Sequence, residues 1–130
     1  MKWEYDDGGR SRYFKGSTGD CAVRAIAIAT ETDYKEVYDR LYEISGSSPR
    51  NGVSKKTVDS YMAEIGWVWH ATMRVGSGCT THMRASEIPM GRVVCRLSKH
   101  VAAVVDSVLH DTYDCTRGGT RCIYGYWQME

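Results

Sequence analysis

The spacing of apolar residues changes once along the chain, near Gly66, and this change limits the architectures that the chain can adopt. Before it, apolar residues recur every three or four positions, which is the period of an α-helix. From Trp67 onward they alternate with polar residues, which is the period of a β-strand. Helices first and strands afterwards predict an α+β fold, with N-terminal helices packed on a C-terminal antiparallel sheet.

The first expected helix begins at Cys21 and continues to Thr30. It is rich in Ala and Ile and apolar on nearly every side, so we expect it at the centre of the fold. Asp20, or Thr18 just before it, is the expected N-cap residue. The sequence therefore predicts that Cys21 lies in the first turn of a buried helix.

Two more helices and several strands follow. Asp33 and Ser54 are typical N-cap residues for the second and third helices, and Gly66 ends the third. We interpret the tyrosines of the second helix as core residues rather than as a ligand-stacking surface. A short edge strand is expected near Trp3, and further strands over 67–73, 92–97, 101–105, 108–113 and 122–127.

Length and charge exclude several classes of protein. The chain has 130 residues, which fits one domain over residues 1–130. Its 17 basic and 16 acidic residues give a net charge of +1, which argues against a surface for nucleic acid or for anionic membranes. The first residues lack the apolar stretch of a secretory signal, so we expect a cytoplasmic location.

The cysteine count is odd, and there is no C-x-x-C motif. In a reducing compartment we expect all five cysteines to be thiols, and we predict no metal and no cofactor. One alternative is a zinc-supported domain in which Cys79 and His82 form one half-site and Cys115 and Cys122 the other. Structural zinc sites usually have two closely spaced pairs, which disfavours this alternative.

Cys21 and His100 are the residues best suited to chemistry. Free N–H groups and the helix dipole stabilise a thiolate at a helix N-terminus. An imidazole can accept and return a proton near neutral pH, and His100 opens the buried strand 101–105. We interpret the remaining histidines, which lack a partner nearby in sequence, as structural or solvated: His70, His82 and His110.

The following hairpin supplies a third group. If Asp106 and Ser107 form a two-residue turn, Ala102 faces Asp111, and His100 shares a sheet face with both. Asp111 would then hold the orientation of the imidazole. A one-residue bulge would reverse this parity.

Three segments resemble small papain-like cysteine peptidase-fold proteins of bacteria and their phages: GDCAVRAIAIAT at 19–30, SKHVAAVVD at 98–106 and HDTYD at 110–114. The resemblance covers residues 16–31 and 92–127, about half of the chain. It implies a papain-like fold with the nucleophile at the start of the central helix. It also implies that Cys21 is the nucleophile, His100 the general base and acid, and Asp111 the orienting carboxylate.

The oxyanion hole departs from the family pattern. Papain has a glutamine six residues before its cysteine, and here that position is Lys15, with no Gln or Asn nearby. Ser17, Thr18 or Lys15 would have to donate instead. Loss of one such donor typically costs on the order of 10²–10³ in rate.

The resemblance implies a cysteine hydrolase or transferase of the peptidase, isopeptidase or deamidase type, acting on a protein or peptide, in the host cytoplasm if the chain is phage-encoded. The alternative is a non-catalytic papain-like scaffold that binds a host or partner protein. The missing upstream donor favours this alternative, as do aromatic residues near the termini: Trp3, Tyr124, Tyr126 and Trp127.

Overall fold

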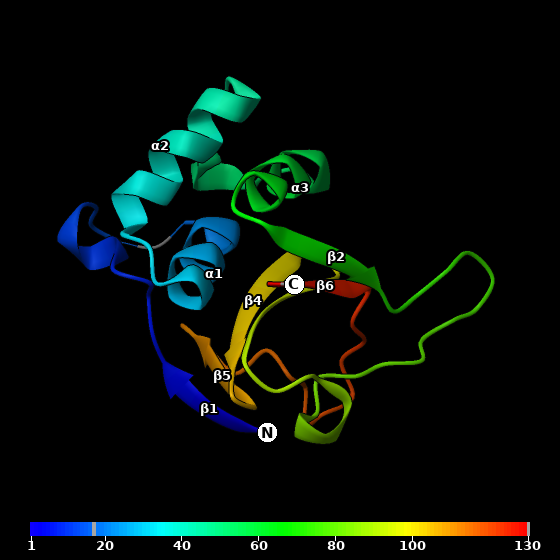
Figure 1. The fold of residues 1–130 in the computed structure, drawn as a ribbon. Helices are drawn as coiled ribbons and strands as arrows, with labels where there is room; N and C mark the ends of the chain where they lie inside the picture. The colour runs from blue at the N-terminus through cyan, green and yellow to red at the C-terminus, as the bar shows by residue number, and fades with distance from the viewer. Residues whose placement is uncertain (17, 130) are drawn as a thin grey trace.

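The computed structural model describes residues 1–16 and 18–129, and within these residues the chain forms three α-helices and one six-stranded mixed sheet. The α+β class predicted from the change of period is confirmed. Helix α1 packs against β4 of the sheet, and α2 packs on α1 (Figure 1). None of the described helices has the length and apolar character needed to cross a bilayer.

The three helices begin at the positions that their expected N-cap residues predicted. Helix α1 spans Cys21–Thr30, α2 spans Tyr34–Ser45 and α3 spans Lys55–Glu64. Asp33 accepts hydrogen bonds from the first backbone N–H groups of α2, and Ser54 caps α3 in the same way. Three short 3₁₀ helices lie between the longer elements: η1 (Arg10–Arg12), η2 (Pro49–Asn51) and η3 (Ala85–Glu87).

The sheet has the strand order β1-β5-β4-β3-β6-β2. Its strands are β1 (Lys2–Tyr5), β2 (Trp67–Ala71), β3 (Arg92–Leu97), β4 (His100–Val105), β5 (Val108–Asp111) and β6 (Gly125–Met129). The five C-terminal strands pair antiparallel, as predicted, and the N-terminal strand β1 makes the sheet mixed by pairing with β5 in parallel. Nearly the whole chain connects these two strands, and a long connection permits parallel pairing.

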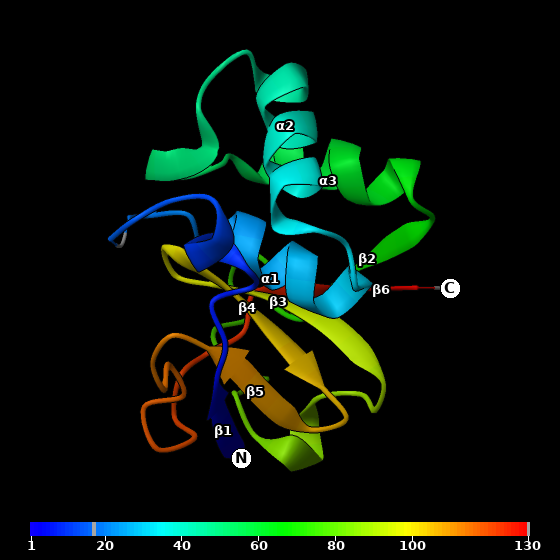
Figure 2. The same cartoon turned by 90° about the vertical axis from the view of Figure 1, so that its left-hand side faces the viewer.

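Each face of the sheet has its own buried cluster. The helix-facing cluster contains Val94, Val101, Ala103 and Trp127 of the sheet, packed on α1, α2 and α3. The opposite cluster contains Val93, Cys95, Leu97, Ala102, Val104 and Leu109, packed under loop residues Met83, Ile88, Cys115 and Ile123. Figure 2 shows the helices on one side of the sheet and these loops on the other. Strict alternation along β3 and β4 therefore separates helix-facing from loop-facing side chains.

Helix α2 is amphipathic, as its sequence predicted. It buries Tyr34, Val37, Tyr38 and Leu41, so the tyrosines at 34 and 38 are core residues.

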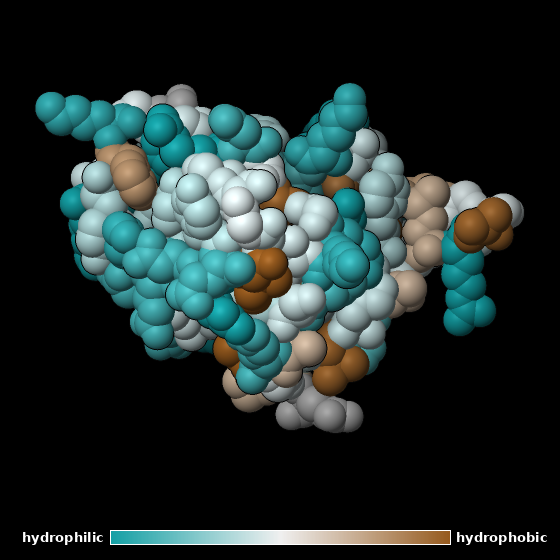
Figure 3. Space-filling view, turned by 90° about the horizontal axis from the view of Figure 1, so that it is seen from above, coloured by the Kyte–Doolittle hydropathy of each residue, from teal (hydrophilic) through white to brown (hydrophobic). Residues whose placement is uncertain are grey.

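Seen from above, over α2 and α3, the described surface is mostly hydrophilic, with apolar residues in small separate patches (Figure 3). Among the terminal aromatic residues offered as partner contacts, Trp127 is buried, whereas Trp3 and Tyr124 are exposed.

Two cysteines form a disulfide, which contradicts the prediction that all five are thiols. Cys79 in the loop after β2 is bonded to Cys122, and their Cα atoms are 5.8 Å apart. An isolated antiparallel bridge between His82 and Cys122 brings the two segments together. Disulfides are typical of oxidising compartments, so this bond gives no support to the predicted cytoplasmic location, which stays a prediction.

The carboxylate of Asp20 does not cap α1, contrary to the prediction. Asp20 has no exposed surface, and its Oδ2 accepts hydrogen bonds from Arg10 Nη1 at 2.9 Å and from the Tyr34 hydroxyl at 2.5 Å. Its Oδ1 accepts one from Arg24 Nη1 at 2.6 Å. One buried carboxylate therefore connects η1, α1 and α2. We call Arg10, Asp20, Arg24 and Tyr34 the Asp20 cluster.

We predict that Asp20→Asn lowers the free energy of unfolding by about 3–5 kcal/mol, because Arg10 would keep a buried charge without a counter-ion and Arg24 would keep only the more distant Asp111. Urea unfolding followed by circular dichroism measures this loss. The matched control is Asp39→Asn, which removes the carboxylate of the exposed pair Lys35–Asp39. Exposed pairs contribute little, so a similar loss in both variants would contradict the prediction.

Candidate active site

Cys21 and His100 line the same pocket, although they come from different layers of the fold. The pocket has a volume of about 270 Å³ and lies between the start of α1, the residues that follow η2, and the β3–β4 turn. Its lining residues are Cys21, Ala22, Asn51, Gly52, Val53, Arg96, Leu97, Lys99, His100 and Val101. We refer to it as the Cys21 pocket.

His100 and Asp111 are in direct contact. His100 Nε2 and Asp111 Oδ2 are 2.6 Å apart, and the two residues are only 8% and 4% exposed. The predicted register is confirmed: Val105 pairs with Val108 and Ala103 with His110, so Asp111 lies diagonally opposite His100. Asp106 and Ser107 both have positive φ, as the two-residue turn requires.

The rest of the Asp111 residue is also fixed. Its Oδ1 accepts a hydrogen bond from the Thr112 backbone N–H at 2.7 Å. Its backbone carbonyl accepts hydrogen bonds from the Trp3 indole at 3.0 Å and from the Asp6 N–H at 3.1 Å. Strand β1 and the residue after it, which the sequence suggested only as a short edge strand, thus fix the backbone of Asp111 beside the imidazole.

The contact between Cys21 and His100 is looser than the contact between His100 and Asp111. Both residues are in the described part of the chain, and no hydrogen bond of normal geometry joins their side chains there. The imidazole still affects the thiol electrostatically. Burial raises the pKa of Cys21, but the hydrogen-bonding capacity and charge of the nearby imidazole outweigh burial and lower the pKa below its ordinary value.

The pKa of the His100 imidazole is shifted in the opposite direction. Burial lowers the pKa of His100, but the hydrogen bond to Asp111 outweighs it, and the pKa lies well above its ordinary value. Contacts with the thiols of Cys115 and Cys21 act in the same direction. A lowered thiol pKa beside a raised imidazole pKa favours a thiolate–imidazolium pair near neutral pH.

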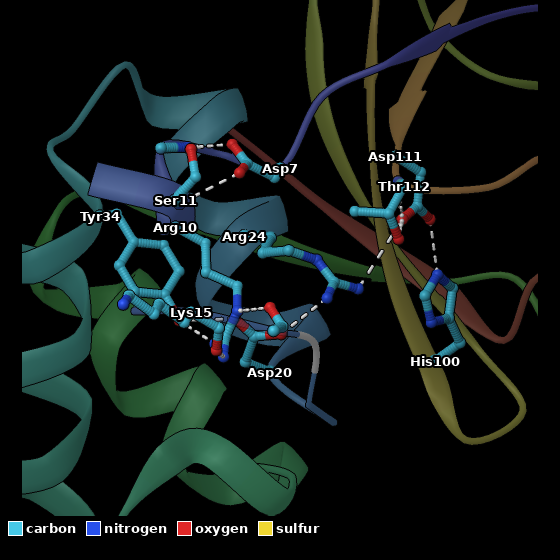
Figure 4. Close-up of polar contacts among 12 residues, drawn as sticks. Asp7, Arg10, Ser11, Lys15, Asp20, Arg24, Tyr34, His100, Asp111 and Thr112 are labelled. Atoms are coloured by element: carbon cyan, nitrogen blue, oxygen red, sulfur yellow. Dashed lines mark hydrogen bonds and ion pairs between the residues drawn. The ribbon is translucent and has the colours of Figure 1, made fainter. Parts of the chain in front are cut away.

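The Asp20 cluster extends to this pair. Arg24 Nη2 lies 3.8 Å from Asp111 Oδ1, while Nη1 of the same guanidinium binds Asp20 (Figure 4). Arg24 is buried, and its charge also contributes to the lowered pKa of the Cys21 thiol. This connection could not be predicted, because nothing local in the sequence links residue 24 to residue 111.

The three residues upstream of Cys21 that were predicted as oxyanion-hole donors differ in their surroundings. The Lys15 side chain is exposed, and its carbonyl accepts a hydrogen bond from Arg10. The Thr18 hydroxyl is buried and has no hydrogen-bond partner among the described residues. Ser17 lies outside the described residues. Asn51, which the sequence analysis overlooked because it is far from Cys21 along the chain, lines the Cys21 pocket.

The other histidines have partners that explain them without catalysis. His70 is exposed on β2 and stacks on Tyr126, with ring centroids 5.1 Å apart. His82 Nδ1 lies 3.2 Å from a Glu87 carboxylate oxygen. His110 is within 4.0 Å of Glu4. Their interpretation as structural or solvated residues agrees with these contacts.

The proposed zinc quartet is not assembled. Cys79 and Cys122 are bonded to each other, and Cys115 lies elsewhere, with His100 and Asp111. The donor atoms of His100, Asp111 and Cys115 lie within 4.8 Å of one another, which makes these three the one group in the described chain that could hold a metal. A metal there would have to displace the 2.6 Å hydrogen bond between His100 and Asp111.

Comparison with protein-family models, with curated proteins and with solved structures found no match to this chain. Its function therefore has to be argued from the site itself.

We predict that the rate of Cys21 alkylation by iodoacetamide rises with pH through a midpoint below the free-thiol value of about 8.5. In His100→Ala the imidazolium is lost while burial remains, so the midpoint moves upward. Cys95 and Cys115 are buried and Cys79 and Cys122 are bonded, so mass spectrometry of the native protein reports on Cys21. Equal midpoints in both proteins would contradict the thiolate–imidazolium pair.

Proposed function

We propose that this chain is a papain-like cysteine hydrolase or transferase that uses Cys21, His100 and Asp111 on a peptide, isopeptide or glutamine amide. The observation that carries the proposal is the buried hydrogen bond of 2.6 Å between His100 and Asp111. Cys21 lies at the N-terminus of α1 and lines the same pocket as His100. The order of these elements also supports the papain-like assignment: the cysteine opens the central helix, the histidine opens β4 and the aspartate ends β5.

The first half of the proposed reaction forms a thioester. The Cys21 thiolate attacks the scissile carbonyl carbon, and a C–S bond forms as the carbonyl becomes an oxyanion. The imidazolium of His100 gives its proton to the leaving nitrogen, the C–N bond breaks, and the amine departs. Asp111 stabilises the imidazolium before this transfer and holds the ring in orientation throughout.

The second half regenerates the enzyme. Neutral His100 takes a proton from water, the resulting hydroxide attacks the thioester, and the C–S bond breaks to give the acid, the thiolate and the imidazolium. An amine in place of water would give a transferase by the same steps. What enters the pocket therefore decides between hydrolysis and transfer, and the catalytic groups are the same for both.

For the oxyanion we propose two donors. One is the backbone N–H of Cys21, which belongs to the first turn of α1, where the N–H groups have no partner within the helix. The other is the side-chain amide of Asn51, which lines the same pocket and would replace the absent upstream glutamine. An amide has the donor geometry that acyl transfer uses, whereas the exposed Lys15 side chain is not part of the pocket lining.

We predict that p-nitrophenyl acetate acetylates Cys21 and that the acetyl thioester turns over. Cys21→Ala should form no thioester, and His100→Ala should hydrolyse its thioester about 10²–10⁴ times more slowly. Asn51→Ala should slow acylation about 10²–10³-fold. Absorbance of the released nitrophenolate and intact mass measure the two steps.

His82→Ala is the matched control, because His82 is paired with Glu87 and does not line the Cys21 pocket. It should leave both rates unchanged. A wild-type protein that is acetylated no faster than a free thiol, or whose thioester never turns over, would contradict the proposal and favour the non-catalytic scaffold.

A further inference from the structure

We infer that the Cys21 pocket selects acidic peptides, by binding a substrate carboxylate near the scissile carbonyl between Arg96 and Lys99. The inference rests on the proposed function, because it assigns a substrate class to the same pocket. It goes beyond that function in naming two specificity residues outside the group Cys21, His100 and Asp111.

Apart from the Cys21–His100 pair, the charged residues that line the pocket are all cationic. Arg96 and Lys99 contribute cationic groups and Asn51 contributes an amide, and no Asp or Glu among the described residues lines this pocket. The whole chain has a net charge of only +1, so this is a local departure from balance. A concave site with cations and no carboxylate attracts anions.

Arg96 stands apart from the other shielded arginines in the described part of the chain. Arg96 is half-buried, yet its guanidinium has no hydrogen-bond or ion-pair partner among the described residues. Every other arginine that is buried or half-buried binds a carboxylate or a backbone carbonyl: Arg10, Arg24, Arg40, Arg92 and Arg121. Shielding a guanidinium from water without a partner is unfavourable, so Arg96 has donors free for a ligand.

The register of β3 explains why Arg96 reaches the pocket. Val94 belongs to the helix-facing cluster, and Arg96, two residues later, shares its face of the sheet. Arg96 pairs across the sheet with Val101, which also lines the pocket. Arg96 therefore lies on the same side of the sheet as α1 and the Cys21 thiol.

Lys99 is held in place by the β3–β4 turn. It has a positive φ of 54°, and it directly precedes His100. Arg96 near the end of β3 and Lys99 in the turn are thus both at the end of the hairpin that carries the imidazole. A guanidinium can bind both oxygens of a carboxylate, and a nearby ammonium adds a point charge, so the pair suits an Asp or Glu side chain or a chain-terminal carboxylate.

A neighbouring pocket gives room for a peptide rather than a small acid. It has a volume of about 510 Å³ and shares Gly52 and Val53 with the Cys21 pocket. Its polar lining consists mostly of hydroxyl residues: Ser45, Ser47, Ser54, Thr57 and Ser60. Lys56 is the one charged residue among the described residues that line it. An extended chain crossing both pockets would meet hydroxyl groups and cations, and no carboxylate among the residues that line them.

The test compares two reagents that differ in charge at the same thiol. Iodoacetate carries the carboxylate that Arg96 and Lys99 would bind, and iodoacetamide is its neutral analogue. We expect Arg96→Gln and Lys99→Gln each to lower the ratio of the iodoacetate to the iodoacetamide rate about fivefold, the size expected for one partly exposed ion pair. The iodoacetamide rate itself should change less than about twofold, since the thiol and imidazole are untouched.

Arg74→Gln is the charge-matched control, because Arg74 lies in the loop after β2 and does not line the Cys21 pocket. The imidazolium of His100 also attracts iodoacetate, so only the difference between variants and wild type is used. Lys99 is exposed, so Lys99→Gln keeps the test valid if Arg96→Gln fails to fold. A rate ratio unchanged in the folded variants, or lowered equally by Arg74→Gln, would overturn the inference.

The same data separate this inference from the proposed function. Fast iodoacetamide labelling that depends on His100, with an unchanged ratio in the Arg96 and Lys99 variants, refutes the acidic substrate and leaves the hydrolase intact. Slow labelling with ordinary thiol behaviour in wild type refutes the hydrolase, and the assignment of its substrate falls with it.

Discussion

The ion pairs between the buried carboxylate of Asp20 and the guanidinium groups of Arg10 and Arg24 are the interactions on which both the fold and the candidate site depend. A carboxylate directly before Cys21 would normally cap α1 and repel a thiolate. Here Arg10 and Arg24 neutralise it and hold its oxygens away from the helix N–H groups. Asp20 therefore does not occupy the first N–H groups of α1 beside the thiol, and such backbone donors are what stabilisation of a thiolate or an oxyanion requires. The residue expected to be a cap acts instead as the centre of a buried ion cluster.

The sequence was sufficient wherever a local pattern determined the structure. Helix α1 and strand β3 have the predicted bounds, because an apolar run with a start signal and a short alternating segment each specify one element. The turn at Asp106 and Ser107 fixed the register of β4 and β5, and register alone predicted that Asp111 lies beside His100. The contact between two of the three candidate catalytic residues thus followed from a count of residues around one turn.

What the sequence did not predict depends on contacts between distant segments. The parallel pairing of β1 with β5 and the Cys79–Cys122 disulfide each join segments that no periodicity relates. Strand β6 starts at Gly125 rather than at Cys122, since Cys122 makes only an isolated bridge with His82. A Cβ at residue 125 would clash with the Trp69 indole, so glycine is required where β6 meets β2. Asn51 and Arg96 were overlooked for the same reason, because only the folded chain brings them to the Cys21 pocket.

The two faces of the sheet explain how the candidate site is shielded. By strand alternation, His100 and Asp111 share the loop-facing side with Ala102 and Leu109, whereas Cys21 comes from the helix side. The groups meet because His100 is the first residue of β4, where the sheet ends and both sides are within reach. Cys115, from the loop layer, lies against the His100–Asp111 pair and keeps it out of water. Burial by itself lowers the pKa of His100, whereas the contact with the Cys115 thiol raises it, so the loop layer acts on the imidazole although it contributes nothing to the lining of the Cys21 pocket.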